Sequence, residues 1–222
     1  MSQAISEKAY KGLGMEGFTA RWYASLTSKS MNDFKALARR VGWQIAPGSH
    51  VLEVAPGPGY FAIELAKLGP CQVTGLDISH TFVEIARRNA AEAGVDIDFQ
   101  HGNAASMPFD DQSFDFLVCR AAFKNFAQPL RALEEMYRVL KPGGRVLIID
   151  LRKDASRESV SKAVDAMGLG IVNTLITKLT FRSMLLKRAY TKQDFEQFLS
   201  QTKFGSVEIK EDLTALDISL QR

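Results

Sequence analysis

The 222-residue sequence has few of the residues that hold metals or form disulfides. It contains two cysteines, Cys71 and Cys119, and three scattered histidines. Both cysteines lie in apolar, strand-like runs without the paired spacing of a disulfide framework or a zinc site. We therefore expect a reducing compartment and no bound metal.

Long apolar runs and an excess of one charge are also lacking. No stretch approaches the length of a membrane span, and the first residues have no apolar signal core. The formal charge is +3, from 28 basic and 25 acidic residues, which is too mild to indicate a nucleic-acid partner. These absences predict a cytoplasmic protein with no transmembrane segment and no nucleic-acid partner. They leave the oligomeric state open.

What is present is a regular alternation of strand and helix patterns from residue 50 onward, in a chain that is 46% hydrophobic. Helical periods cover residues 60–68, 81–93 and 129–140. Such alternation predicts right-handed βαβ units, hence a doubly wound α/β sheet with helices on both faces. A final hairpin gives seven strands with an antiparallel last strand. The predicted strands are "HVLEVA", "CQVTGLD", "VDIDFQ", "FDFLVCR", "RVLIIDL", "SVEIKED" and "LTALDISLQ".

Two segments lie outside this alternation. We expect residues 1–40 to form an N-terminal helical lid on a domain of residues 41–222, and residues 155–189 to form a helical substrate cap. The cap is unusually apolar, with lysines and arginines interspersed, so weak contact with a membrane surface is the alternative. Two helix starts are predicted as well. Thr81 and Glu84 have the spacing of a capping box, and Thr191 is the expected N-cap of the last helix.

The first predicted strand runs into a glycine-rich turn, "VLEVAPGPGYFA". Gly57 and Gly59 precede a helix, with Ala62 at the third small position. Glycines let a ligand approach the backbone closely, and the helix start offers unpaired N–H groups. The pattern fits a dinucleotide or another adenosine cofactor. Asp77 ends the second strand eighteen residues after Gly59, where a carboxylate can bind both ribose hydroxyls.

Glu53 distinguishes between these cofactors. A carboxylate at the mouth of the loop would repel an anionic pyrophosphate, which disfavours a nicotinamide-dependent oxidoreductase. S-adenosylmethionine instead carries an ammonium and a sulfonium, for which an acid is favourable. The turn is therefore predicted to hold the amino-acid end of S-adenosylmethionine.

Four segments in order, "VLEVAPGPG", "VTGLDIS", "GNAASMPFDDQSFDFLV" and "ALEEMYRVLKPGGRVLIID", resemble the successive motifs of class I S-adenosylmethionine-dependent methyltransferases. The resemblance spans roughly residues 48–151 and implies S-adenosylhomocysteine as the product. Two departures are Ala55-Pro56, where the family has Gly and a small residue, and Asn103, where it usually has aspartate. The asparagine oxygen still accepts a hydrogen bond. The implied cofactor contacts are Glu53, Ala55, Gly57 and Gly59 at the methionine side, Asp77 at the ribose, Ile78 on the adenine, and Asn103 with Ala104 at its edge.

The stretch "FKNFAQPLRALEEMYRVLKPGG" is similar to the corresponding part of the ubiquinone/menaquinone C-methyltransferases, which implies a small, partly apolar acceptor. Lys124 and Asn125 follow the fourth strand at the edge where such sheets bind ligands. They are the catalytic candidates, because an ammonium can stabilise an acceptor anion and an amide can orient it. A solvated surface position is the alternative for Lys124.

Three further residues complete the predicted site. Arg120 binds the cofactor carboxylate or pairs with an internal acid. Tyr23 is expected to cover the sulfonium by cation–π attraction, with Trp22 as a weaker candidate, and a hydrophobic plug is the alternative for both.

Two other functions stay open. One is a cofactor-binding protein that transfers no methyl group, and the other is methylation of RNA or protein. Against the latter, the fourth strand ends in "CRAAFKN" and not in the Asn/Asp-Pro-Pro-aromatic motif of enzymes that methylate nucleobase amino groups.

Overall fold

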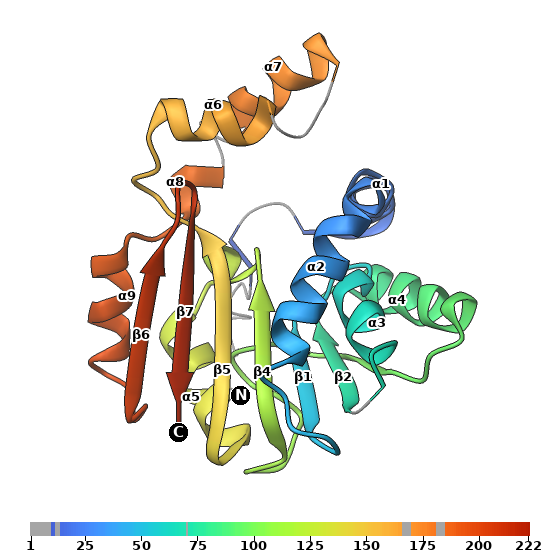
Figure 1. Ribbon diagram of the computed structural model, residues 1–222, viewed down its shortest axis with the longest axis vertical. Coiled ribbons are helices and arrows are strands. Elements are labelled where there is room, and N and C mark those ends of the chain that lie inside the picture. The colour runs from blue at the N-terminus through green and yellow to red at the C-terminus, as the bar shows by residue number, and fades with distance from the viewer. Residues whose placement is uncertain (1–9, 12–13, 70, 166–169, 181–184) are drawn as a thin grey trace, which may run out of the picture.

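A seven-stranded sheet forms the centre of the computed structural model, which describes the chain except for residues 1–9, 12–13, 70, 166–169 and 181–184. The strand order is β3-β2-β1-β4-β5-β7-β6. The first five strands are parallel, and β7 is antiparallel to β5 and β6 (Figure 1). The predicted doubly wound sheet with an antiparallel last strand is confirmed. The strands are β1 His50–Val54, β2 Gln72–Asp77, β3 Asp98–His101, β4 Phe114–Arg120, β5 Leu140–Leu151, β6 Ser206–Glu211 and β7 Ala215–Gln221.

Helices cover both faces of the sheet. The first face is packed by α2 Met31–Gly42, α3 Tyr60–Ala66 and α4 His80–Ala93, and the second by α5 Pro129–Val139 and α9 Lys192–Leu199. Alternate residues of β1 face the two layers. Val51 belongs to the core under α2 and α3, whereas Leu52 and Val54 belong to the core under α5. Glu53 therefore points toward the α2–α3 layer.

The two predicted helix starts have different outcomes. At α9, Thr191 and Asp194 form a reciprocal capping box, so Thr191 is confirmed as the N-cap. At α4, the predicted capping box is wrong, because Ser79 is the N-cap and its Oγ accepts the N–H of Phe82. The backbone N–H of Thr81 donates to Glu16 instead, so a residue from outside the helix takes this group.

Several short helices lie beyond the carboxyl ends of the parallel strands (Figure 1). On one side α1 Gly17–Thr27 packs on α4, and the turn η1 Ser28–Ser30 leads from it into α2. On the other side lie α6 Arg157–Asp165, α7 Ile171–Thr180 and α8 Leu186–Arg188. Within the described residues no helix is long and apolar enough to cross a bilayer. The division into lid and cap stays a prediction, and residues 166–169 and 181–184 of the cap lie outside the described residues.

Candidate active site

Two alanines mark the carboxyl ends of the neighbouring strands β1 and β4. Ala55 has φ 59° and Ala121 has φ 55°, both in the left-handed region. This conformation costs a residue with a β-carbon roughly 1–2 kcal/mol. Such strain persists where the surroundings hold it in place, and it is common at functional sites. Ala55 thus takes a conformation that glycine would adopt without this cost.

The two glycines of the turn have different roles. A β-carbon on Gly59 would lie 2.8 Å from the Phe99 ring and 3.0 Å from the Ala86 side chain. Gly59 is therefore needed for close packing of α3. A β-carbon on Gly57 would meet nothing within 4 Å, so this side of the turn is open to a ligand. The prediction treated both glycines as cofactor contacts, and the geometry supports that role for Gly57.

Asp77 ends β2 next to the glycine turn and is buried. Its two carboxylate oxygens accept the backbone N–H groups of Gly57 and Ser79, each at 2.9 Å. Burial raises the pKa of Asp77 to about 6, although these two hydrogen bonds act in the opposite direction. Each oxygen retains a second lone pair, so the held carboxylate can still accept from a ribose hydroxyl.

Glu53 is 3% exposed, and its Oε2 atom has no hydrogen-bond partner among the described residues. Burial raises the pKa of Glu53 to about 8, although the charge of Arg120 and the N–H of Ala62 lower it. Buried polar atoms are normally paired, so this oxygen calls for an explanation. A cationic ligand group at the end of β1 would supply the missing partner.

Arg120 ends β4 beside Glu53, and its guanidinium lies 4.6 Å from the ring centroid of Phe34 on α2. Its charge acts on Glu53, which agrees with the alternative of an internal acid as its electrostatic partner. The stacking on Phe34 holds the guanidinium beside the strand end. Sequence patterns did not predict Phe34 as part of this site, since its position on α2 indicates an ordinary core residue.

The predicted adenine side follows β2 and β3. The Ile78 carbonyl lies 3.0 Å from His101 Nε2, and the His101 ring stacks on His80 with centroids 3.6 Å apart. Asn103 Oδ1 accepts the N–H of Ala105 at 2.9 Å, which fixes the turn after β3. Ala104 is partly buried against the core. The structure thus gathers these residues in the loops that follow two adjacent strand ends.

Tyr10 and Lys11 lie at the same edge, and neither is among the site residues predicted from the sequence. Tyr10 forms an isolated antiparallel bridge with Phe126, next to the hydrogen bond from Lys11 N–H to the Asn125 carbonyl at 2.8 Å. Burial raises the pKa of Tyr10, and the charge of Asp77 acts in the same direction, whereas that of Arg188 opposes it. A lone tyrosine outside any helix or strand pattern gives no sequence signal for this position.

The two aromatic residues of α1, Trp22 and Tyr23, point in different directions. The Tyr23 ring packs edge-on against Phe82 of α4, with centroids 5.8 Å apart. Tyr23 therefore lies on the inner side of α1, as a cofactor-covering role requires. Trp22 is 57% exposed and so does not cover the site.

Lys124 is 4% exposed and lies on the turn η2 Phe123–Asn125 after β4. Its Nζ donates to Asp150 Oδ1 at 2.9 Å and to the Ala121 carbonyl, and its backbone N–H donates to Asp150 Oδ2 at 2.8 Å. The alternative of a solvated surface lysine is wrong. Because its ammonium donates hydrogen bonds to both Ala121 and Asp150, Lys124 holds η2 against β5. Asn125, by contrast, is only partly buried.

Comparisons with known proteins agree with this geometry. Residues 52–148 match the model of a methyltransferase domain family. A demethylmenaquinone methyltransferase of Deinococcus radiodurans is 32% identical over 163 residues, which cover 68% of this chain and 66% of that protein. The protein of the same name from Symbiobacterium thermophilum is 41% identical over 115 residues, 50% of this chain and 46% of that protein. The chain thus spans about half to two thirds of the length of these relatives.

A solved structure from Methanococcus maripaludis, assigned as an S-adenosylmethionine-dependent methyltransferase, has the same fold. It aligns with a TM-score of 0.78 over 96% of both chains, at 19% identity. The family match extends from Leu52, beside Glu53, to Ile148 in β5, and so includes the open turn at Gly57 and the fixed carboxylate of Asp77. Residues 52–148 therefore form a methyltransferase domain, and the chain has the fold of S-adenosylmethionine-dependent methyltransferases, whose cofactor is S-adenosylmethionine.

Proposed function

We propose that this protein transfers the methyl group of S-adenosylmethionine to a small, partly apolar acceptor of the quinone or phenol type. The cofactor supplies an activated methyl carbon. The acceptor atom bonds to that carbon as the carbon–sulfur bond breaks, which leaves S-adenosylhomocysteine, and the acceptor gives up its proton. The protein's contribution is to bind, align and exclude water.

The observation that carries the proposal is the unpaired Oε2 of Glu53 at the end of β1, with the carboxylate of Asp77 at the end of β2. The first fits the cofactor's ammonium, and the second fits its ribose. Between them Gly57 leaves the turn open. This set of groups is wrong for a pyrophosphate, so we expect binding of S-adenosylhomocysteine and no competition by NAD.

Aromatic side chains follow the end of β4, where Phe123 and Phe126 are buried in the core and Tyr190 is partly buried. The Phe123 ring contacts Phe126 and Tyr190, with centroids 5.4 and 6.0 Å apart. Asn125 lies between the two phenylalanines and is the residue we propose to orient the acceptor. We propose that Lys124 acts as a positioning residue, since its ammonium is bonded to Asp150 and holds the turn that carries Asn125. The names of the relatives support a quinone-type acceptor.

The test is an activity assay with the purified chain, S-adenosylmethionine and a panel of water-soluble quinols and phenols. Formation of S-adenosylhomocysteine together with a methylated acceptor is the expected result, and Asp77→Ala is the control that lacks the ribose acid. Labelling of RNA or protein from methyl-labelled cofactor, with none of the small acceptors modified, would refute the acceptor class. Tight cofactor binding without turnover on any acceptor would favour a non-transferring protein.

The free thiols of Cys71 and Cys119 support a reducing compartment such as the cytoplasm.

A further inference from the structure

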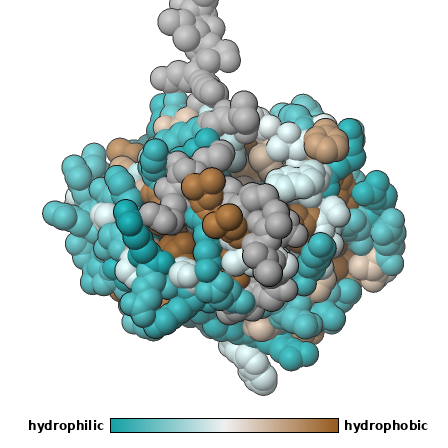
Figure 2. Space-filling view, turned by 90° about the horizontal axis from the view of Figure 1, so that it is seen from above, coloured by the Kyte–Doolittle hydropathy of each residue, from teal (hydrophilic) through white to brown (hydrophobic). Residues whose placement is uncertain are grey.

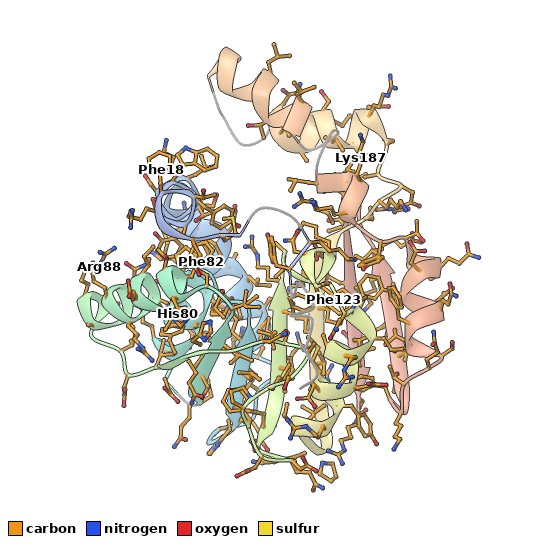
Figure 3. The ribbon with its side chains drawn as sticks, turned by 180° about the vertical axis from the view of Figure 1, so that it is seen from behind. Phe18, His80, Phe82, Arg88, Phe123 and Lys187 are labelled. Atoms are coloured by element: carbon orange, nitrogen blue, oxygen red, sulfur yellow. The ribbon has the colours of Figure 1, made fainter. Side chains whose placement is uncertain are left out.

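Helix α1 is apolar on two opposite sides. Its inner side packs Ala20 and Ala24 against α4. Its outer side carries Phe18, Trp22 and Leu26, four residues apart, and Phe18 is 78% exposed. Side chains at this spacing share one helix face. Phe18 projects away from the sheet at the top of α1 (Figure 3). The outer stripe is covered by none of the described elements.

A second set of exposed apolar side chains lies on α7, at the same end of the molecule (Figure 1). Leu175 is 70% exposed. Brown side chains lie in the middle of this upper face when it is seen from above (Figure 2). Large exposed apolar side chains are therefore concentrated here, since five of the nine among the described residues are on α1 and α7: Phe18, Trp22, Leu26, Leu175 and Leu179.

Helices α1 and α7 themselves carry only basic charges, although Glu16 is the N-cap of α1 and Asp165 lies beside α7. The sequence has no Asp or Glu in residues 17–32 or 166–190. These two stretches carry six of the basic residues, whereas the whole chain has a net charge of +3, so the remainder of the chain has a net charge of −3. Lys178 is paired with Asp165 of α6, and Lys187 is exposed. The six are Arg21, Lys29, Lys178, Arg182, Lys187 and Arg188, of which Arg182 lies outside the described residues and is known from the sequence alone.

We propose that the face formed by α1 and α7 docks onto an anionic membrane surface. Apolar stripes surrounded by lysine and arginine are the signature of helices that lie in the lipid interface. Tryptophan, as at position 22, is favoured at that depth. A second copy of the chain fits this face less well, because it would bring two surfaces of the same positive charge together.

The orientation links this surface to the catalytic edge. Both helices lie beyond the carboxyl ends of the parallel strands, where Asp77 and Asn125 are found (Figure 1). Docking therefore faces the acceptor side of the sheet toward the lipid. This link rests on the proposed function, in which the acceptor is apolar, and it names the bilayer as the source from which the acceptor is drawn.

The two tryptophans of the chain allow a direct test with the full-length protein. Trp22 lies on the proposed face, and Trp43 is 91% exposed just after α2, which leads away from that face into the start of β1. Trp43→Phe leaves only Trp22 as a fluorophore, and Trp22→Phe leaves only Trp43. With vesicles of three parts phosphatidylcholine to one part phosphatidylglycerol, we expect a blue shift for the Trp22 reporter and none for the Trp43 reporter. Equal responses, or none, would overturn the proposal.

Affinity measurements by vesicle co-sedimentation extend the test. We expect Phe18→Ser with Trp22→Ser to lower vesicle binding at least tenfold, whereas Trp43→Ser leaves it unchanged. Because one basic residue near an anionic surface contributes about 1 kcal/mol, reversal of Lys29 to Glu should lower binding by roughly an order of magnitude, and more salt should weaken wild-type binding. Arg39→Glu, toward the far end of α2, is the matched charge control.

Two further outcomes would count against a lipid partner. Binding to phosphatidylcholine alone that is as strong as binding to the anionic mixture would overturn the charge-based proposal. A dimer in solution that Phe18→Ser with Trp22→Ser dissociates would assign the face to a second copy. The enzyme assay separates this inference from the proposed function. The Phe18 and Trp22 variants should methylate a water-soluble acceptor at the wild-type rate, and loss of vesicle binding with that activity intact leaves the proposed function standing.

Discussion

Replacing Glu53 by its neutral isostere should stabilise the ligand-free protein, and the gain should depend on pH. The ordinary pKa of the carboxyl is 4.5, and burial raises it to about 8 in the folded state. Below pH 4.5 Glu53 is protonated in both the folded and the unfolded chain, so its ionisation does not change the free energy of unfolding. As pH rises toward 8, the unfolded chain ionises while the folded one does not, and the free energy of unfolding falls by about 1.4 kcal/mol per unit.

The magnitude follows from this interval. At pH 7 the buried Glu53 lowers the free energy of unfolding by about 3 kcal/mol, and above pH 8 this cost levels off at about 5 kcal/mol. Glu53→Gln removes this term, so we expect the variant and the wild type to differ little at pH 5 and by several kcal/mol at pH 8. Asp77, whose pKa is also raised, is present in both proteins and cancels from the difference. Urea unfolding at four pH values measures it, and parallel curves for the two proteins would refute the reasoning.

When S-adenosylhomocysteine is present, Glu53→Gln should have the opposite effect, because the substitution should weaken binding of this ligand. S-adenosylhomocysteine brings an ammonium that we expect to face ionised Glu53, so affinity should rise about tenfold per pH unit up to pH 8 as the carboxyl gives up its proton. Methylthioadenosine has the ribose but no ammonium, and its affinity isolates the contribution of Asp77. Titration calorimetry should show the steeper pH dependence for S-adenosylhomocysteine, and Glu53→Gln should abolish the difference. An unchanged difference in the variant would place the ammonium elsewhere.

Four further substitutions test the turn and the strand ends. Ala55→Gly should raise the free energy of unfolding by about 1 kcal/mol, because glycine adopts its positive φ without strain, and a drop would mean that the methyl group's packing outweighs the strain. Gly59→Ala should destabilise clearly more than Gly48→Ala, because the two glycines share φ 79° but only the former would clash; equal losses in chemical unfolding would contradict the packing role of Gly59. Lys124→Met should lower the free energy of unfolding by about 3–5 kcal/mol, because it leaves the buried carboxylate of Asp150 without its cation. Asn125→Ala should instead lower turnover by about one to three powers of ten, with the affinity for S-adenosylhomocysteine unchanged. Full stability of the former, or full activity of the latter, would remove the residue from the assigned role.

The sheet and the cofactor edge were predictable because their signals are local. The strand from His50 to Val54, the glycines of the following turn and the acid at the end of β2 lie in short windows whose patterns have a direct physical cause. Parallel strands then place the turn and the acid at one edge without further information. The last helix was also predictable from Thr191 and Asp194, since a capping box needs only residues three positions apart.

The wrong capping box at Thr81 and the wrong surface alternative for Lys124 both concern residues whose partners are distant in sequence. Thr81 has the spacing of an N-cap, but Glu16 takes its backbone N–H from sixty-five residues away. Lys124 sits in a polar pair after a strand, a pattern typical of a group that faces solvent or ligand. Its partner Asp150 lies twenty-six residues later, at the end of the neighbouring strand. Neither contact has a periodic or local signature, so tertiary packing decides both.

Several groups that cost stability lie together at one edge of the sheet. Two strained alanines, an unpaired buried glutamate and a buried aspartate of raised pKa all lie at the carboxyl ends of β1, β2 and β4. A ligand with a cationic group and a ribose can pair with the two carboxylates and hold the strained strand ends in place, so binding should offset part of this cost. The cofactor is then coupled to folding, because a ligand at a hundred times its dissociation constant stabilises the folded state by about 2.7 kcal/mol. Clustered cost at a site therefore indicates ligand binding more directly than any one of these residues does alone.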